Sequence, residues 1–245
     1  ETYTINAYYN NTTGLTSGHT FILEIDGDDD CSVDGAKTLM TSTTLVTNGT
    51  GSEIEVPAYK NIILEAQGTI ELPNSLPITG NWTDNGGTLT HNNYLFAFSG
   101  STQQTISGSA TTAFYSLSLN NGNGLLLNAN ANIALNLTLT DGDIDLNGNI
   151  ITLASGGTLN ETGLVTGATG HITITENIGV PSNDNVGGLG FELSSATNMG
   201  STEIRRFHAA QTGELSGGNS IERYFYITPT TNSGLNATLV FHYDD

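Results

Sequence analysis

The sequence predicts an all-β protein, in which a parallel β-helix of stacked coils of about 20 residues is followed by the start of a β-sandwich. Composition supports this prediction, because 37 Thr, 27 Asn and 30 Gly among 245 residues favour strands and tight turns over helices. Spacing supports it too. Apolar residues recur 20 positions apart, and short alternating segments separated by Asn/Gly turns lie between them.

The repeat assigns residues 60–178 to the β-helix. Its equally spaced apolar positions are Ile78 and Phe98, Leu117 and Leu137, Leu119 with Leu139 and Leu159, and Ile133 with Leu153. One coil cannot bury its own apolar side, so neighbouring coils must stack. An antiparallel sandwich also alternates strands with turns, but it does not explain a register that several separate positions share.

The flanking regions have other patterns. Residues 1–59 are β-patterned, with Thr20–Asp26 the clearest strand, and are predicted to form an N-terminal cap or irregular first coils. Residues 179–203 are predicted to be a loop-rich linker, because this range contains the Pro-, Asn- and Gly-rich run 181–190. Residues 204–245 are predicted to be a β-sandwich-like module that continues past Asp245 in the natural protein.

The charge restricts the classes of partner. The formal net charge is −19, from 24 acidic and 5 basic residues. Such a chain repels nucleic acid and anionic lipid surfaces, so neither is an expected partner. The single cysteine, Cys31, excludes an intramolecular disulfide and a Cys-based zinc cluster. No apolar run approaches the ~20 residues of a membrane span.

Several segments carry a resemblance to a known class of proteins. Gly80–Gly87, Phe98–Gly108, Phe114–Asn128 and Leu135–Leu153 occur in that order. Together they resemble the repeats of large secreted β-helix surface proteins of gliding and other Bacteroidota-type bacteria, many of which are adhesin-like cargo of type IX secretion. Ile221–Pro229 and Leu235–Tyr243 resemble the β-sandwich that follows the helix in those proteins. The resemblance implies an exported, extracellular or cell-surface protein with a role in adhesion.

An acidic segment is the candidate metal site. Oxygen donors at alternating positions suit Ca²⁺, and the candidate ligands are Asp26, Asp28, Asp30 and Asp34. The segment does not fit an EF-hand loop, because Cys31 occupies the position of the turn glycine and Lys37 that of the bidentate acid. A looser calcium loop and a solvated acidic loop both remain open.

Other polar and aromatic residues have competing interpretations. Asp143 and Asp145 alternate with Ile144 and Leu146, which predicts that the acids point outward and the aliphatic side chains inward. Aromatic residues in the repeats are candidates for a sugar-stacking surface, namely Trp82, Tyr94 and Tyr115. The alternative is that these rings pack at the corners of the coils.

No catalytic motif is present. The five histidines are scattered, and the sequence contains no Gly-X-Ser-X-Gly, HExxH or P-loop pattern. We therefore expect a non-enzymatic structural and adhesive segment that contacts extracellular glycans or surfaces, with calcium as a candidate stabiliser. The alternatives are a polysaccharide-processing lyase or hydrolase, and a filament subunit that associates head to tail.

Overall fold

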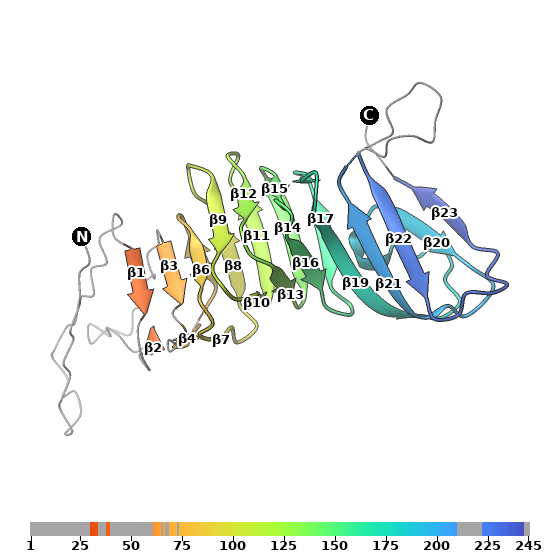
Figure 1. Ribbon diagram of the computed structural model, residues 1–245, viewed down its shortest axis with the longest axis horizontal. Helices are drawn as coiled ribbons and strands as arrows, with labels where there is room; N and C mark the ends of the chain where they lie inside the picture. Colours follow the sequence, from red (N-terminus) through yellow and green to blue (C-terminus); the bar gives the residue numbers. More distant parts are fainter. Residues whose placement is uncertain are drawn as a thin grey trace, which may run out of the picture.

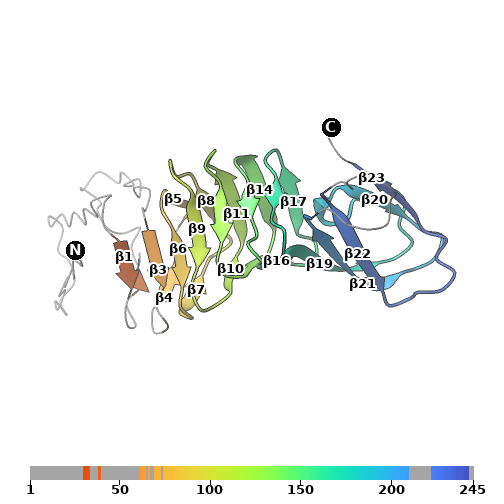
Figure 2. The ribbon, with the colours of Figure 1, turned by 45° about the horizontal axis from the view of Figure 1, so that its top comes forward.

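The computed structural model shows an elongated all-β molecule, which confirms the predicted fold class. Parallel strands of successive coils lie side by side along the long axis, and an antiparallel module occupies the C-terminal end (Figures 1 and 2). The structure describes residues 30–33, 38–39, 61–64, 66, 69–72, 74–209 and 222–242. Within these residues no helix is long and apolar enough to cross a membrane.

Each coil contributes strands to three parallel sheets that surround a common interior. Sheet A contains β1 (Asp30–Val33), β3 (Asn61–Leu64), β6 (Trp82–Asp84), β9 (Gln104–Ser107), β12 (Leu125–Leu127), β15 (Ile144–Asp145) and β18 (Val165–Thr166). Sheet C contains β5 (Leu76–Ile78), β8 (Leu95–Phe98), β11 (Ser116–Asn120), β14 (Asn136–Asp141) and β17 (Thr158–Glu161). The third side is formed first by sheet B, of β2 (Thr38–Leu39), β4 (Thr69–Glu71) and β7 (Thr88–Thr90).

Sheet D continues the third side and extends beyond the coils. Its parallel strands are β10 (Thr112–Phe114), β13 (Ala131–Ile133), β16 (Ile150–Leu153) and β19 (His171–Ile178). The sheet then adds β21 (Gly200–Phe207) and β22 (Tyr224–Pro229), both in antiparallel pairing. A separate antiparallel pair, sheet E, consists of β20 (Phe191–Ser194) and β23 (Thr238–Phe241), and a single 3₁₀ turn, η1, spans Val186–Gly188.

The pairing register confirms most of the apolar repeat. The structure pairs Ile78 with Phe98, Leu117 with Leu137, Leu119 with Leu139, and Ile133 with Leu153. One expectation is wrong, because Leu159 pairs with Leu137 and Leu139 pairs with Glu161. That coil is longer, so the partners are 22 residues apart instead of 20. A spacing rule alone therefore misplaces the last coil by two residues.

The interior is mostly apolar, and a buried polar network lies near its N-terminal end. Trp82 is fully buried, and its ring lies 5.6 Å from those of Phe96 and Phe114. Its Nε1–H donates to Oγ1 of Thr112 at 2.8 Å, and that hydroxyl donates to Asp84 at 2.9 Å. The network satisfies the polar atoms that burial removes from water, and it connects two successive coils.

Amide side chains connect the coils at the corners. Asn81 N–H donates to Oδ1 of Asn61, and Asn81 Oδ1 accepts from Thr105 N–H, both at 2.8 Å. Further along, Asn130 accepts from Ile150 N–H at 2.9 Å, and Asn149 donates to the Leu127 carbonyl at 2.9 Å. Strand pairing leaves backbone groups unpaired where the chain turns, so these bonds explain much of the Asn content.

The C-terminal module covers the last coil with two facing sheets. Phe191 of β20 lies 5.0 Å from Phe225 of β22, and Phe225 lies 5.5 Å from Phe241 of β23, measured between ring centroids. These rings pack sheet E against the inner face of sheet D. Phe191 and Leu189 are fully buried in the same apolar core as the coils.

A buried ion pair joins the module to the solenoid. Arg206 of β21 is fully buried, and both of its terminal nitrogens donate to the carboxylate of Glu161 on β17 at 2.6 Å. His208, with 7% of its surface exposed, lies nearby and hydrogen-bonds to the Val165 backbone. Burial, reinforced by the charges of Arg206 and Arg223, lowers the pKa of His208 to about 3. The imidazole is therefore neutral at neutral pH.

The structure describes only a few residues of the predicted N-terminal segment but all of the predicted linker. Of residues 1–59 only 30–33 and 38–39 are described, and their strands β1 and β2 pair with β3 and β4 of the solenoid. The segment 179–203, predicted as a loop-rich linker, contains β20 and the first residues of β21.

Removing one member of the buried ion pair is expected to be costly. Arg206→Met should lower the free energy of unfolding by about 3 kcal/mol, because it removes the partner of the Glu161 carboxylate from a site with little water. Adding Glu161→Gln should recover more than half of this loss, since glutamine keeps an acceptor for the Val165 N–H. Urea denaturation of the four proteins of this cycle measures both values. Additive losses in the double variant would contradict the coupling.

His208 makes a separate contribution to pH dependence. Below the ordinary histidine pKa of 6.5, the unfolded chain binds a proton that the folded His208 does not bind, so stability falls as the pH drops from 6.5 toward 3. His208→Asn removes this contribution. The difference in unfolding free energy between wild type and variant should shrink by about 2 kcal/mol between pH 7 and pH 5. Urea denaturation at both pH values tests it, and a constant difference would contradict it.

Candidate functional site: a polar groove at one corner of the solenoid

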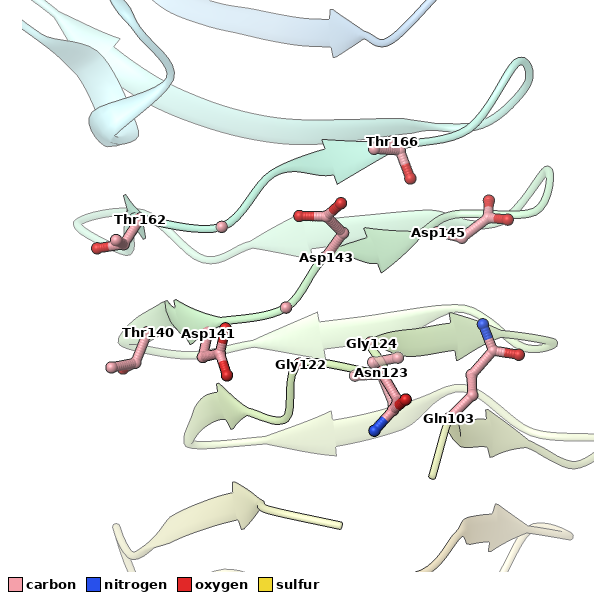
Figure 3. A pocket seen from close by; sticks show the side chains of 13 residues that line it. Gln103, Gly122, Asn123, Gly124, Thr140, Asp141, Asp143, Asp145, Thr162 and Thr166 are labelled. Carbon is pink, nitrogen blue, oxygen red and sulfur yellow. The ribbon is translucent and has the colours of Figure 1, made fainter. Parts of the chain in front are cut away.

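A hollow in the described surface lies where three successive coils turn from sheet C to sheet A. It encloses about 550 Å³ and runs across the turns after β11, β14 and β17 (Figure 3). Its lining consists of Gln103, Gly122, Asn123, Gly124, Leu125, Thr140, Asp141, Gly142, Asp143, Asp145, Thr162, Gly163 and Thr166. The groove is thus built from equivalent positions of stacked coils.

Glycine residues let the coils stack closely at the corner that holds the groove. A Cβ at Gly142 would lie 1.8 Å from the carbonyl oxygen of Asn121 on the preceding coil, and one at Gly163 would lie 2.0 Å from the carbonyl oxygen of Gly142. Gly142 also has a φ of +79°, a backbone conformation that residues other than glycine adopt only with strain. The backbones at this corner therefore stack directly on one another.

A β-bulge lies beside the groove. Leu119 of β11 pairs with Leu139, but the next residue, Asn120, pairs with Asp141, so β14 contains one extra residue at Thr140. A bulge bends the strand and changes which way its side chains point. Thr140 and Asp141 both line the groove (Figure 3).

Two buried amides support the floor. Gln104 and Asn121 are 1% and 2% exposed, and the Asn121 amide donates to Gln104 Oε1 at 3.1 Å and to the Thr102 carbonyl at 2.7 Å. Gln104 in turn donates to the Ile78 carbonyl at 3.0 Å. Burying amides is favourable only when they are hydrogen-bonded, so this arrangement fixes the corner rigidly across three coils.

The groove presents acceptors, donors and hydroxyls, and no basic or aromatic side chain is among its lining residues. Asp143 Oδ1 accepts from Leu164 N–H at 2.8 Å, and Asp145 Oδ1 accepts from Asn147 N–H at 2.9 Å. These bonds orient the two carboxylates. Ile144 and Leu146 between and after them are buried, as the alternation predicted. Such a surface suits a ligand rich in hydroxyl groups and repels anions.

The predicted metal ligands cannot be placed as a group. Asp26, Asp28 and Asp34 lie outside the described residues, and Asp30 is the first residue of β1, where it pairs with Asn61. Among the residues that are described, no cluster of three or more His, Cys, Asp or Glu side chains is arranged to hold a metal ion. The calcium hypothesis for this segment stays a prediction.

The predicted aromatic contacts do not gather in the groove. Trp82 is wrong as a ligand contact, because its indole is completely buried in the interior. Tyr94 is half-buried and packs against the core. Tyr115 is half-buried at the corner between β10 and β11, where its ring lies 5.4 Å from that of His91. The alternative of packing at a corner fits Tyr115, whereas Trp82 lies in a strand and packs in the interior.

Sequence reasoning missed most of the groove. Gln104 and Asn121 looked like ordinary residues of a polar strand and turn, and only their burial in the fold distinguishes them. A spacing signal was present, because Asn121, Gly142 and Gly163 are 21 residues apart and form the corner column.

Comparisons with known proteins do not add a family. A scan against protein-family models finds no match, and searches of curated proteins and of solved structures find no similar protein. The function must therefore be argued from the chain itself.

Gly142 of the corner column and Gly156, in the turn between β16 and β17, provide a matched pair of glycine substitutions. Gly142 and Gly156 share a φ of +79°, but a Cβ at Gly156 meets nothing within 4 Å. The same backbone strain should lower the free energy of unfolding of both alanine variants by roughly 1–2 kcal/mol. Gly142→Ala should cost about 2 kcal/mol more, because its Cβ forces neighbouring coils apart. Urea denaturation measures both, and equal losses would contradict the close stacking at this corner.

Proposed function

We propose that this chain is a structural and adhesive segment of an exported cell-surface protein, and that its polar groove contacts extracellular glycans. The observation that carries the proposal is the groove itself, in which oriented carboxylates, amides and hydroxyls line an open surface of a rigid scaffold. A polysaccharide offers hydroxyl groups as both donors and acceptors, which matches this lining.

The solenoid supports adhesion mechanically. Stacked coils form a stiff rod, and a shallow polar groove binds each ligand weakly because water competes for every hydrogen bond. Repetition of such contacts along a larger surface protein gives avidity. The resemblance to secreted β-helix surface proteins supports the extracellular location, the type IX route and the adhesive role. Calcium bound by the segment from Asp26 to Asp34 would reduce its self-repulsion and fix its shape.

Affinity electrophoresis in gels containing neutral polysaccharides tests the groove. Asp143→Asn keeps an acceptor for the Leu164 N–H but removes the negative charge, and should weaken retention about tenfold. The matched control is Asp184→Asn, an exposed acid outside the groove with the same change of charge, which should leave retention unchanged.

The same samples separate the proposal from its alternatives. Retention without release of new sugar ends supports adhesion. Release of new sugar ends would contradict the adhesive role and show that the chain is an enzyme. Equal retention of Asp143→Asn and wild type would show that the groove does not bind the polysaccharide. Calcium is tested separately by a rise in melting temperature on adding Ca²⁺, which EDTA should reverse. An unchanged melting temperature would reject the calcium hypothesis.

A further inference from the structure

A cluster of aromatic rings lies on the outer face of sheet D, away from the groove. It consists of His171 on β19, Phe207 on β21, and Tyr224 and Tyr226 on β22, and we name it the aromatic platform. Each coil passes from sheet A through sheet D to sheet C, so the corner that holds the groove lies across the coil from sheet D. The two surfaces are therefore separate.

The rings form a continuous array across three strands. Phe207 and Tyr224 stack at 4.7 Å with an interplanar angle of 3°, and Tyr226 meets them edge-on at 5.3 and 5.7 Å. His171 extends the array, with its ring 4.9 Å from Phe207. Antiparallel pairing of β19, β21 and β22 brings these residues together from positions far apart in the sequence.

The platform lies on the face of sheet D opposite the core, with Tyr226 exposed and the other three rings half-buried. Strand β22 turns Phe225 inward against Phe191 and Phe241, whereas its neighbours Tyr224 and Tyr226 point to the opposite face. Tyr226 is 55% exposed. The exposed ring of Tyr226 and the half-buried rings beside it together form the aromatic surface of this face.

A charged pair borders the rings. Arg205 lies opposite Tyr226 in the strand pairing, and its terminal nitrogen contacts Glu203 at 2.8 Å, with both side chains partly exposed. Burial, together with the charge of Arg205, lowers the pKa of His171, so the histidine is neutral at neutral pH. The platform is therefore close to electrically neutral on a molecule of charge −19.

We propose that the aromatic platform is a second binding surface, which takes an uncharged polysaccharide. The C–H faces of the sugar rings pack on Tyr226 and Tyr224. The sugar hydroxyls accept hydrogen bonds from Arg205 and donate hydrogen bonds to Glu203. Charge decides between this partner and others. The net charge of −19 disfavours a polyanionic glycan, and it also disfavours a second copy of the chain. This proposal shares only the class of ligand with the groove and does not depend on it.

The test uses the whole chain and soluble hydroxyethyl cellulose and galactomannan as neutral probes, with alginate as the anionic probe, in affinity gels. Tyr226→Ala removes the most exposed ring without opening the core, and should weaken retention by the neutral probes about tenfold. The matched control is Asn132→Ala, an exposed residue on β13 of the same sheet face and outside the ring cluster, which should behave as wild type. Melting temperatures confirm that both variants are folded.

Each outcome separates this proposal from the one for the groove. Loss of retention in Tyr226→Ala supports the platform, whatever Asp143→Asn does. Retention that Asp143→Asn weakens and Tyr226→Ala leaves intact overturns the platform and keeps the groove, and no retention of wild type overturns both. Preference for alginate, or a dimer in solution that Tyr226→Ala dissociates, would also overturn the platform as a site for neutral glycans.

Discussion

The in-register stacking of coils is the constraint on which the structure depends. An isolated coil leaves its apolar side chains facing its neighbour, so each coil is stable only if the next covers it. In this chain apolar contacts fill most of the interior, and polar contacts also join the coils at the corners, where amides such as Asn121 and Asn149 bond to backbone groups of adjacent coils. A side chain that shifts one coil therefore disturbs the interior and the groove together.

The last coil of such a stack would expose its apolar interior, and here the C-terminal module packs over it. The module begins where β21 pairs with β19 in the antiparallel direction. β19 is parallel to β16 but antiparallel to β21, so sheet D continues while the coils stop. Arg206 and Glu161 lie at this change of direction, between a strand of the last coil and a strand of the module. A buried ion pair adds little net stability but penalises every wrong alignment that leaves one charge alone, which suits a junction with one correct register.

The sequence predicted what depends on local periodicity and failed where distant segments meet. Alternation placed Ile144 and Leu146 inside, and spacing found four of the five apolar pairs. The exception, Leu139 with Leu159, arose because a longer coil shifts the register without changing the pattern of residue types. Trp82 was a candidate sugar contact because it shares its face of β6 with Asp84, and an acidic residue gives no sign that this face is buried. The platform could not be anticipated, since Phe207 meets Tyr224 only through an antiparallel pairing across a 16-residue gap.

The groove and the aromatic platform differ in the type of contact that each can make with a ligand. The groove consists of charged and polar groups oriented by backbone bonds, so its contacts depend on hydrogen-bond geometry and compete with water. The platform offers ring surface that loses little by desolvation, so its contacts depend on area. Both belong to one stack of coils in which strands of successive coils pair within each sheet and share an apolar interior, and this keeps their separation fixed. A flexible polysaccharide that reaches both surfaces would gain affinity from that fixed geometry, since the second contact forms at a high effective concentration once the first is made.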